Sequence, residues 1–234
     1  MTRKTIYLQI LITIILLAAA LALFELTNID LAIQDHLFVQ QTQSWLIDTK
    51  DPLGRFLFYD GFKAALIVLG VTAAAAYLAS FFYASLRDYR SRLLLLLLSM
   101  IFVPLIIAGM KDFTNIYCPS QLEHYGGDKP YVKVFESYPK DFVQTSRGRC
   151  FPAGHAAGGF SLMMLYFVFC QKRHRRLGLL FGIGSGWITG IYQMAKGAHF
   201  LSHTVVTMLG AWLIILIIYR FAGGKTDETA VFSV

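Results

Sequence analysis

Hydrophobic residues gather in long runs along this chain, and polar or basic segments separate the runs. A helix that crosses a bilayer needs roughly 20 mostly apolar residues. The pattern therefore predicts an all-α fold, an integral membrane six-helix bundle. The expected spans lie at about 5–25, 62–86, 93–112, 152–170, 177–195 and 200–221.

The connections between the runs predict a single membrane domain over 1–234, with long loops at about 26–61 and 113–151. The first run follows Met-Thr-Arg-Lys, as the core of a signal peptide would. Its apolar part is longer than the usual core of ~7–15 residues, and no clear small-x-small cleavage site follows. We therefore expect this run to be retained as a helix.

The composition supports lipid as the main solvent. Hydrophobic residues make up 56% of the chain and charged residues 15%, whereas soluble domains carry about a quarter charged residues. This excludes a disordered protein, a disulfide-built miniprotein and a conventional cytosolic enzyme. A net charge of +7 would suggest nucleic acid in a soluble protein. Here basic residues at the membrane ends explain it, and no nucleic-acid partner is expected.

Two compact basic clusters, at 87–92 and 172–176, lie directly against the ends of predicted spans. Such clusters favour the cytoplasmic side. We therefore expect both termini in the cytoplasm, the two long loops outside it, and a bacterial inner membrane as the location.

The first long loop, Thr27 to Asp60, mixes aromatic side chains with acids and amides. One interpretation is an amphipathic stretch that lies along the membrane interface. The other is a loop that covers the ends of the helices. The sequence leaves both open.

Three segments on the expected outer side collect unusual residues. Lys111 ends the third span and precedes 114–119, residues 147–155 run into the fourth span, and residues 196–203 join the fifth span to the sixth. Alternating spans bring all three segments to one membrane face. Histidines at helix starts, among Lys and Arg and with few carboxylates, suit a phosphate. Cations and helix-start N–H groups neutralise the transferring group, and an imidazole can attack it.

These segments resemble the signature of the type 2 phosphatidic acid phosphatase (PAP2) and vanadium haloperoxidase superfamily. The family pattern is Lys-x6-Arg-Pro, then Pro-Ser-Gly-His, then Arg-x5-His-x3-Asp. The resemblance covers roughly residues 105–210, the expected PAP2-like core. The corresponding segments are Lys111-x6-Cys118-Pro119, Pro152-Ala153-Gly154-His155 and Gln193-x5-His199-x3-His203.

The resemblance implies a role for each matching residue. His199 is expected to be the nucleophile that forms a phosphohistidine, and His155 the general acid that protonates the leaving lipid oxygen. Lys111 is expected to bind phosphate oxygens, and the backbone at Gly154 to add N–H donors. The resemblance implies no metal and no cofactor.

Four positions depart from the family pattern, and two interpretations stay open. In the first, the site is rebuilt, and in the second it is degenerate and binds a lipid phosphate without hydrolysing it. We favour the active site because the lysine and both histidines of the pattern remain. The replaced positions are Cys118 for Arg, Ala153 for Ser, Gln193 for Arg and His203 for Asp.

In a rebuilt site, Lys196, Arg147 and Arg149 restore the positive charge that binds phosphate. A neutral His203, four residues after His199, lies one helical turn away and can accept a hydrogen bond that orients the nucleophile. A further possibility for His203 is that it only satisfies polar contacts inside the bundle.

The cysteines and the histidine pair allow other chemistry. Cys118 and Cys150 either form a disulfide that ties the first motif to the second in an oxidising compartment, or remain separate thiols. His199 and His203 also have the spacing of zinc ligands. Because no Asp, Glu or Cys lies close by in sequence to complete a shell, no metal is expected.

The function expected from the sequence is hydrolysis of a phosphomonoester or pyrophosphate of a membrane lipid at the extracytoplasmic face. The expected partners are that lipid substrate and the bilayer. The alternatives are a non-catalytic binder or transporter of anionic lipid, a lipid phosphotransferase and a metal-dependent membrane hydrolase. The identity of the lipid, the acceptor and the oligomeric state stay open.

Overall fold

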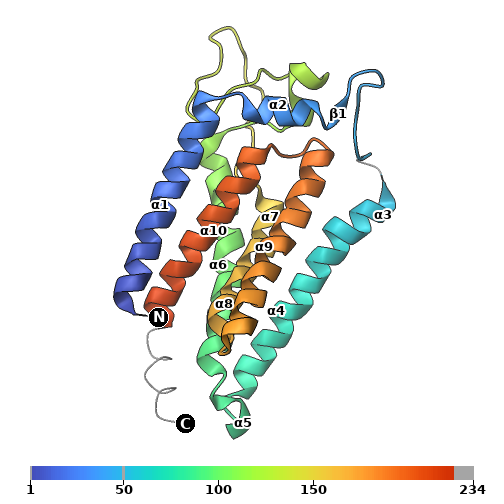
Figure 1. Ribbon diagram of the computed structural model, residues 1–234. Helices are drawn as coiled ribbons and strands as arrows, with labels where there is room; N and C mark the ends of the chain where they lie inside the picture. The colour runs from blue at the N-terminus through green and yellow to red at the C-terminus, as the bar shows by residue number, and fades with distance from the viewer. Residues whose placement is uncertain (1, 49–50, 224–234) are drawn as a thin grey trace.

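The computed structural model describes residues 2–48 and 51–223, and it is mostly helical. Long helices run side by side, and loops with short elements cover one end of them (Figure 1). The predicted all-α fold with six long helical segments is confirmed. These are α1 (Arg3–Leu26), α4 (Gly61–Ala79), α6 (Arg90–Thr114), α9 (Lys172–Ala195), α10 (Leu201–Ala222), and a broken helix of α7 (Gly154–Ser161), the 3-10 turn η4 (Leu162–Met164) and α8 (Leu165–Val168).

The second helix starts earlier than predicted, at Pro52 rather than near 62. Here α3 (Pro52–Arg55) and the π-helical turn η1 (Phe56–Asp60) lead directly into α4. The Asp51 carboxylate caps this start by accepting the N–H groups of Leu53 and Gly54 at 3.2 and 2.9 Å. Proline suits the first helical position because an N–H there has no acceptor within the helix.

The predicted loop over 26–61 is therefore wrong at its far end, where residues 52–61 are helical. Residues 49 and 50 of that loop lie outside the described residues. The same helix also ends earlier than predicted, at Ala79 rather than near 86, and α5 (Ala84–Arg87) follows it before α6 begins.

The outer surface of the bundle is apolar. Within the described residues, four helical segments are long and apolar enough to cross a membrane, and Gly154–Val168 is apolar but shorter. Large apolar side chains such as Ile15, Val68, Leu105 and Leu180 are exposed. Exposed apolar surface on this scale marks contact with lipid, so the chain is an integral membrane protein. The four segments are Arg3–Leu26, Pro52–Ala79, Arg90–Gln121 and Leu201–Ala222.

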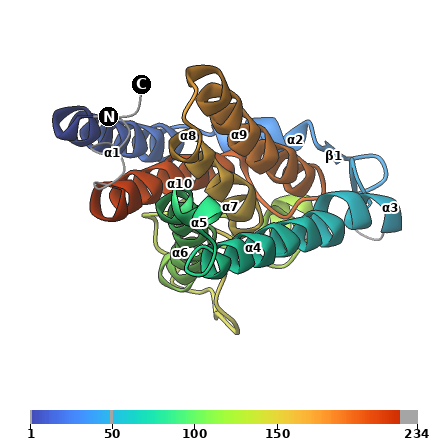
Figure 2. The same cartoon turned by 90° about the horizontal axis from the view of Figure 1, so that it is seen from below.

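The broken helix occupies the middle of the bundle. Viewed from below, α7 lies among α9, α10, α6 and α4, and α1 lies outside α10 (Figure 2). Phe160 and Met164 of this helix are fully buried with Ile107 of α6 and Ile215 of α10. The α9 helix approaches the broken helix closely at Gly182. This is possible because glycine has no Cβ atom, and a Cβ here would collide with the backbone of the broken helix. The second half of α7 and the turn η4 are therefore fixed by packing against α6, α9 and α10.

The first long loop folds over the ends of α9 and α10. It contains α2 (Ile29–Asp35) and a two-stranded antiparallel sheet of β1 (Phe38–Val39) and β2 (Ser44–Trp45), in which Phe38 pairs with Trp45. The Ser202 N–H donates to Asp30 Oδ1 at 2.8 Å, and Gln34 Nε2 donates to the Met194 carbonyl at 2.9 Å. Of the two interpretations of this loop, the structure therefore supports the cover over the helix ends.

Candidate active site

Three histidines from two separate segments form a row under this cover. His155 lies in the first turn of α7, His199 in the connection before α10, and His203 in the first turn of α10. His155 Nδ1 lies 3.2 Å from His199 Nε2, and His199 Nδ1 lies 3.3 Å from His203 Nδ1. The row places His199 in the centre, with each of its ring nitrogens facing another imidazole.

The central histidine is removed from water, whereas one of its partners is accessible. His199 and His203 are each 2% exposed, and His155 is exposed. Burial lowers the pKa of His199 well below its ordinary value, and the nearby His203, His155 and Lys111 lower this pKa further. His199 is therefore neutral at pH 7 and keeps one ring nitrogen without a proton.

Two proton arrangements satisfy both contacts with all three rings neutral. In the first, His155 Nδ1–H donates to His199 Nε2, and His199 Nδ1–H donates to His203 Nδ1. In the second, both hydrogen bonds run in the opposite direction. Only the first arrangement leaves a lone pair on His199 Nε2, the nitrogen that faces His155.

Lys111 and the start of α7 come together beside this row. A Cβ atom at Gly154 would lie 3.0 Å from Lys111 Nζ, so the ammonium group lies directly against the helix start. The N–H groups of the first turn have no acceptors within the helix and favour an anion. The first and second motif segments thus contribute a cation and backbone donors to one place.

Tyr59, which was not predicted as a site residue from the sequence, lies near both His155 and Lys196, the residue that follows α9. Lys196 Nζ lies 5.9 Å from the ring centre of Tyr59 and 5.3 Å from that of Tyr192. The Tyr59 ring in turn lies 5.2 Å from the His155 ring. Burial lowers the pKa of Lys196, and the positive charge of Arg55 lowers this pKa further.

The two predicted arginines lie on the surface. Arg149 Nε is 2.9 Å from Asp112 Oδ1, and both side chains of this ion pair are more than half exposed. Arg147 is also exposed. Because Arg149 is paired with a carboxylate, its charge is partly neutralised, and Lys111 and Lys196 are the better-placed cations.

A disulfide joins the first motif segment to the second. Cys118 and Cys150 are bonded in the structure, and Thr114 Oγ1 donates to the Phe151 carbonyl at 2.6 Å beside them. These links hold the segment before α7 against the end of α6. Cys170 is free and exposed.

Two replaced family positions are buried close to this row. The N–H of Ala153 donates to Thr207 Oγ1 at 2.8 Å, which anchors the segment before α7 on α10. Gln193 is 1% exposed, and its Nε2 atom has no hydrogen-bond partner among the residues that the structure describes. A buried amide without a partner is costly, so Gln193 has a donor available for a ligand.

His155 is one of the residues that line an apolar cavity of about 630 Å³. Side chains of α4, α6 and α7 line it, including Ile67, Leu97 and Pro104. Lys63, in the first turn of α4, contributes a positive charge to the same lining. Lys63 was not predicted as a site residue. The sequence feature that could have indicated it is a single lysine near the start of an apolar span.

The structure is an all-α membrane bundle that gathers histidines, lysines and a helix start at one end. Residues 92–227 match the family model described as the PAP2 superfamily. Since the match covers more than half of the chain, the protein belongs to this superfamily, and its general function is of the phosphatase type. No curated protein and no solved structure matches the chain.

Proposed function

We propose that this protein hydrolyses a phosphomonoester or pyrophosphate of a membrane lipid through a phosphohistidine on His199. The observation that carries the proposal is the 3.2 Å approach of His155 Nδ1 to His199 Nε2, beside an apolar cavity that His155 lines. A buried neutral imidazole is a nucleophile, and the exposed imidazole beside it is placed to transfer protons.

Positive charge and hydrogen-bond donors would stabilise the phosphoryl group. Lys111 lies against the start of α7, and the Gln193 amide supplies a donor that has no partner among the described residues. Fixed donors in a site that excludes water stabilise the charge of a transition state without reorganising. These groups would bind the phosphoryl group in place of the two arginines of the family pattern.

The first chemical step would form a bond between His199 Nε2 and phosphorus. The bond from phosphorus to the lipid oxygen breaks, and His155, which must be protonated when the anionic phosphate is bound, gives that oxygen its proton and becomes neutral. The attacking nitrogen and the proton donor each need about 3 Å to their target atoms. His155 must therefore turn aside to admit the phosphoryl group, and its exposed position allows this movement.

The second step would return the site to its starting state. Water attacks the phosphorus, His155 accepts a proton from that water, and the bond between phosphorus and His199 breaks. His203 Nδ1, 3.3 Å from His199 Nδ1, keeps the proton of His199 on Nδ1 throughout. Its position as acceptor is the one that an aspartate holds in the family pattern.

The apolar cavity favours a substrate that carries a hydrocarbon chain. A chain in the cavity contacts Ile67, Leu97 and Pro104, while its phosphate meets Lys63 and His155. Burial of a chain yields about 0.8 kcal/mol for each methylene group. We propose an extracytoplasmic site in a bacterial inner membrane. The basic clusters at 87–92 and 172–176 support this, because such clusters favour the cytoplasmic side and would lie at the opposite end of the bundle.

A second candidate is a protein that binds anionic lipid without hydrolysing it. Gln193 in place of an arginine, and the pairing of Arg149 with Asp112, favour this alternative because they reduce the positive charge available to the transition state.

Phosphate release from lipid phosphates and lipid pyrophosphates by the purified protein separates the two candidates. Hydrolysis that is lost in His199→Ala supports the phosphatase. Tight lipid binding with no phosphate release from any substrate supports the binder. The release assay is repeated with vanadate, a mimic of pentacoordinate phosphorus, which should inhibit the phosphatase.

A further inference from the structure

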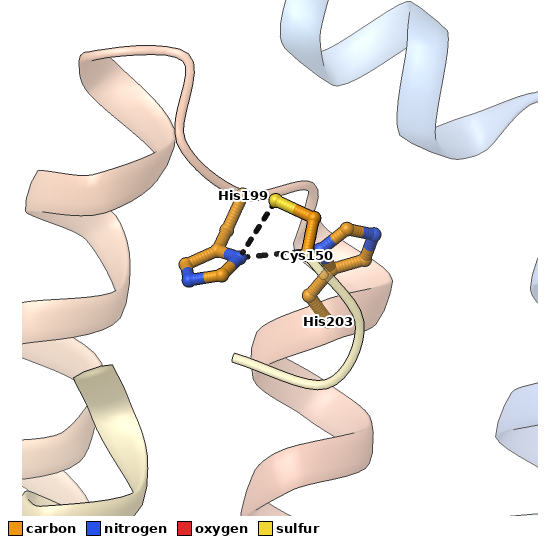
Figure 3. A group of neighbouring side chains, drawn as sticks. All are labelled: Cys150, His199 and His203. Carbon is orange, nitrogen blue, oxygen red and sulfur yellow. Dashed lines mark hydrogen bonds between the residues drawn. The ribbon is translucent and has the colours of Figure 1, made fainter. Parts of the chain in front are cut away.

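A buried sulfur atom lies beside two of the three histidines. Cys150 Sγ is 3.5 Å from His199 Nδ1, and the ligand atoms of Cys150, His199 and His203 all lie within 4.8 Å of one another. Figure 3 shows the sulfur and His203 on the same side of His199, at its Nδ1 atom. His155 contacts the other ring nitrogen, Nε2. Cys150 lies far from both histidines along the chain, so sequence spacing does not reveal this group.

The two separations from His199 Nδ1 match those between ligands of a tetrahedral zinc ion. Zinc lies about 2.0–2.1 Å from imidazole nitrogen and about 2.3 Å from thiolate sulfur. Two nitrogens on such an ion are about 3.3 Å apart, and a nitrogen and a sulfur about 3.6 Å. The nitrogens of His199 and His203 are 3.3 Å apart, and the sulfur lies 3.5 Å from the first of them.

The disulfide prevents this site from binding metal. Cys150 Sγ is bonded to Cys118, and the thiolate is the form of cysteine that ligates a metal. We propose that reduction of the Cys118–Cys150 disulfide creates a zinc site formed by Cys150, His199 and His203. A water molecule would complete the four-coordinate shell.

The chemistry balances with a dithiol as reductant. The dithiol gives two electrons and two protons to the disulfide, so that both cysteines become thiols and the dithiol becomes a disulfide. Zinc then binds Cys150 as a thiolate, releasing one proton, and takes lone pairs from His199 Nδ1 and His203 Nδ1. The thiolate offsets one of the two positive charges of the ion, which Lys111 nearby would otherwise oppose.

Zinc at this site would stop the reaction, an inference that rests on the proposed function. A metal on Nδ1 of His199 leaves the proton on Nε2. That proton points to His155 Nδ1 at 3.2 Å, and Nε2 then has no lone pair with which to attack phosphorus. The disulfide thus keeps the nucleophile free of zinc.

A matched pair of variants of the full chain tests the site. Cys118→Ser and Cys150→Ser both remove the disulfide, but only Cys118→Ser leaves the Cys150 thiol. After incubation with zinc and removal of the unbound metal, we expect about one zinc ion per chain in Cys118→Ser. The same is expected of the dithiol-reduced native chain, with none retained by Cys150→Ser or by the oxidised native chain.

Cobalt(II) in place of zinc gives a readout that does not depend on activity. Cys118→Ser should show the absorption of a tetrahedral cobalt–thiolate site, and Cys150→Ser should not. Equal metal binding by the two variants, or no binding by Cys118→Ser and by the reduced native chain, would overturn the proposal. Gel filtration of each variant in detergent identifies any chain that is not folded. If a variant is not folded, metal binding by the reduced native chain tests the proposal.

Phosphatase assays with and without zinc then separate this inference from the proposed function. Zinc should inhibit Cys118→Ser relative to its own zinc-free rate, a chelator should reverse the loss, and Cys150→Ser should not respond. If zinc and cobalt bind as expected but no variant releases phosphate, the metal site stands and the proposed function fails.

Discussion

His155 Nδ1 lies 3.2 Å from His199 Nε2, although 44 positions separate the two residues in the chain. The contact joins an exposed imidazole to a buried one. Burial removes the positive charge from His199, and exposure leaves His155 free to move and to exchange protons with water. Burial suits His199 to the role of nucleophile that the family resemblance implies, because a neutral imidazole keeps a lone pair.

The two histidines should differ in their response to the leaving group. His155→Ala should reduce the hydrolysis of alkyl phosphates by about 10²–10⁴-fold, the usual contribution of a general acid. With an aryl phosphate such as p-nitrophenyl phosphate the loss should be much smaller, because the phenolate leaves without a proton.

His199→Ala should lose roughly 10⁴-fold or more with both substrate types. Release of the alcohol or phenol by each variant is the measurement. An equal loss for His155→Ala on alkyl and aryl substrates would contradict its role as the acid.

The acid limb of the pH profile should lie below pH 6.5. Burial lowers the pKa of His199, so its lone pair persists while the pH falls through about 6.5, the ordinary pKa of histidine. The dependence of kcat/KM on pH for an aryl phosphate, which does not need His155 as an acid, checks this. An acid limb with its midpoint above 6.5 would mean that the nucleophile is not the buried imidazole.

Lys63 should bind the phosphate from the α4 side of the cavity. Lys63→Met should lower kcat/KM for lipid phosphates by about 10–100-fold, since a hydrogen bond to a charged group contributes about 1.5–3 kcal/mol. Lys63→Arg should retain most of the activity. Lys172→Met, a lysine at the opposite end of the bundle, is the matched control. Equal rates for the two methionine variants would remove Lys63 from the site.

The apolar cavity should be needed for long-chain substrates only. Gly70 lines it, and a Cβ atom at this position meets Met100 Cε at 3.6 Å, which is ordinary contact. Gly70→Leu should therefore fill the cavity and slow the hydrolysis of long-chain lipid phosphates more than that of a short water-soluble phosphate.

Gly109→Leu is the matched control for this substitution, because a Cβ atom at Gly109 on α6 meets nothing within 4 Å. The ratio of long-chain to short-chain rates in the two variants is the measurement. An unchanged ratio in Gly70→Leu would show that the hydrocarbon chain lies elsewhere.

The sequence by itself determined the membrane class, the number of long helical segments and the motif segments that meet at one end. It could do so because hydropathy over about 20 residues decides whether a segment crosses lipid. The start of the second helix at Pro52 escaped this reasoning. The Asp51 cap and the π-helical turn that extend that helix are local hydrogen-bonding features, and hydropathy does not record them.

Only the tertiary structure decided how the chemical groups lie relative to one another. It placed Cys150 against His199, paired Arg149 with Asp112 and brought Lys63 into the cavity that His155 also lines. These relationships join segments that are far apart in the chain and that only the packing of the helices and loops brings together. Sequence spacing fixes neighbours along one helix, whereas contacts between helices depend on how whole side-chain surfaces fit together.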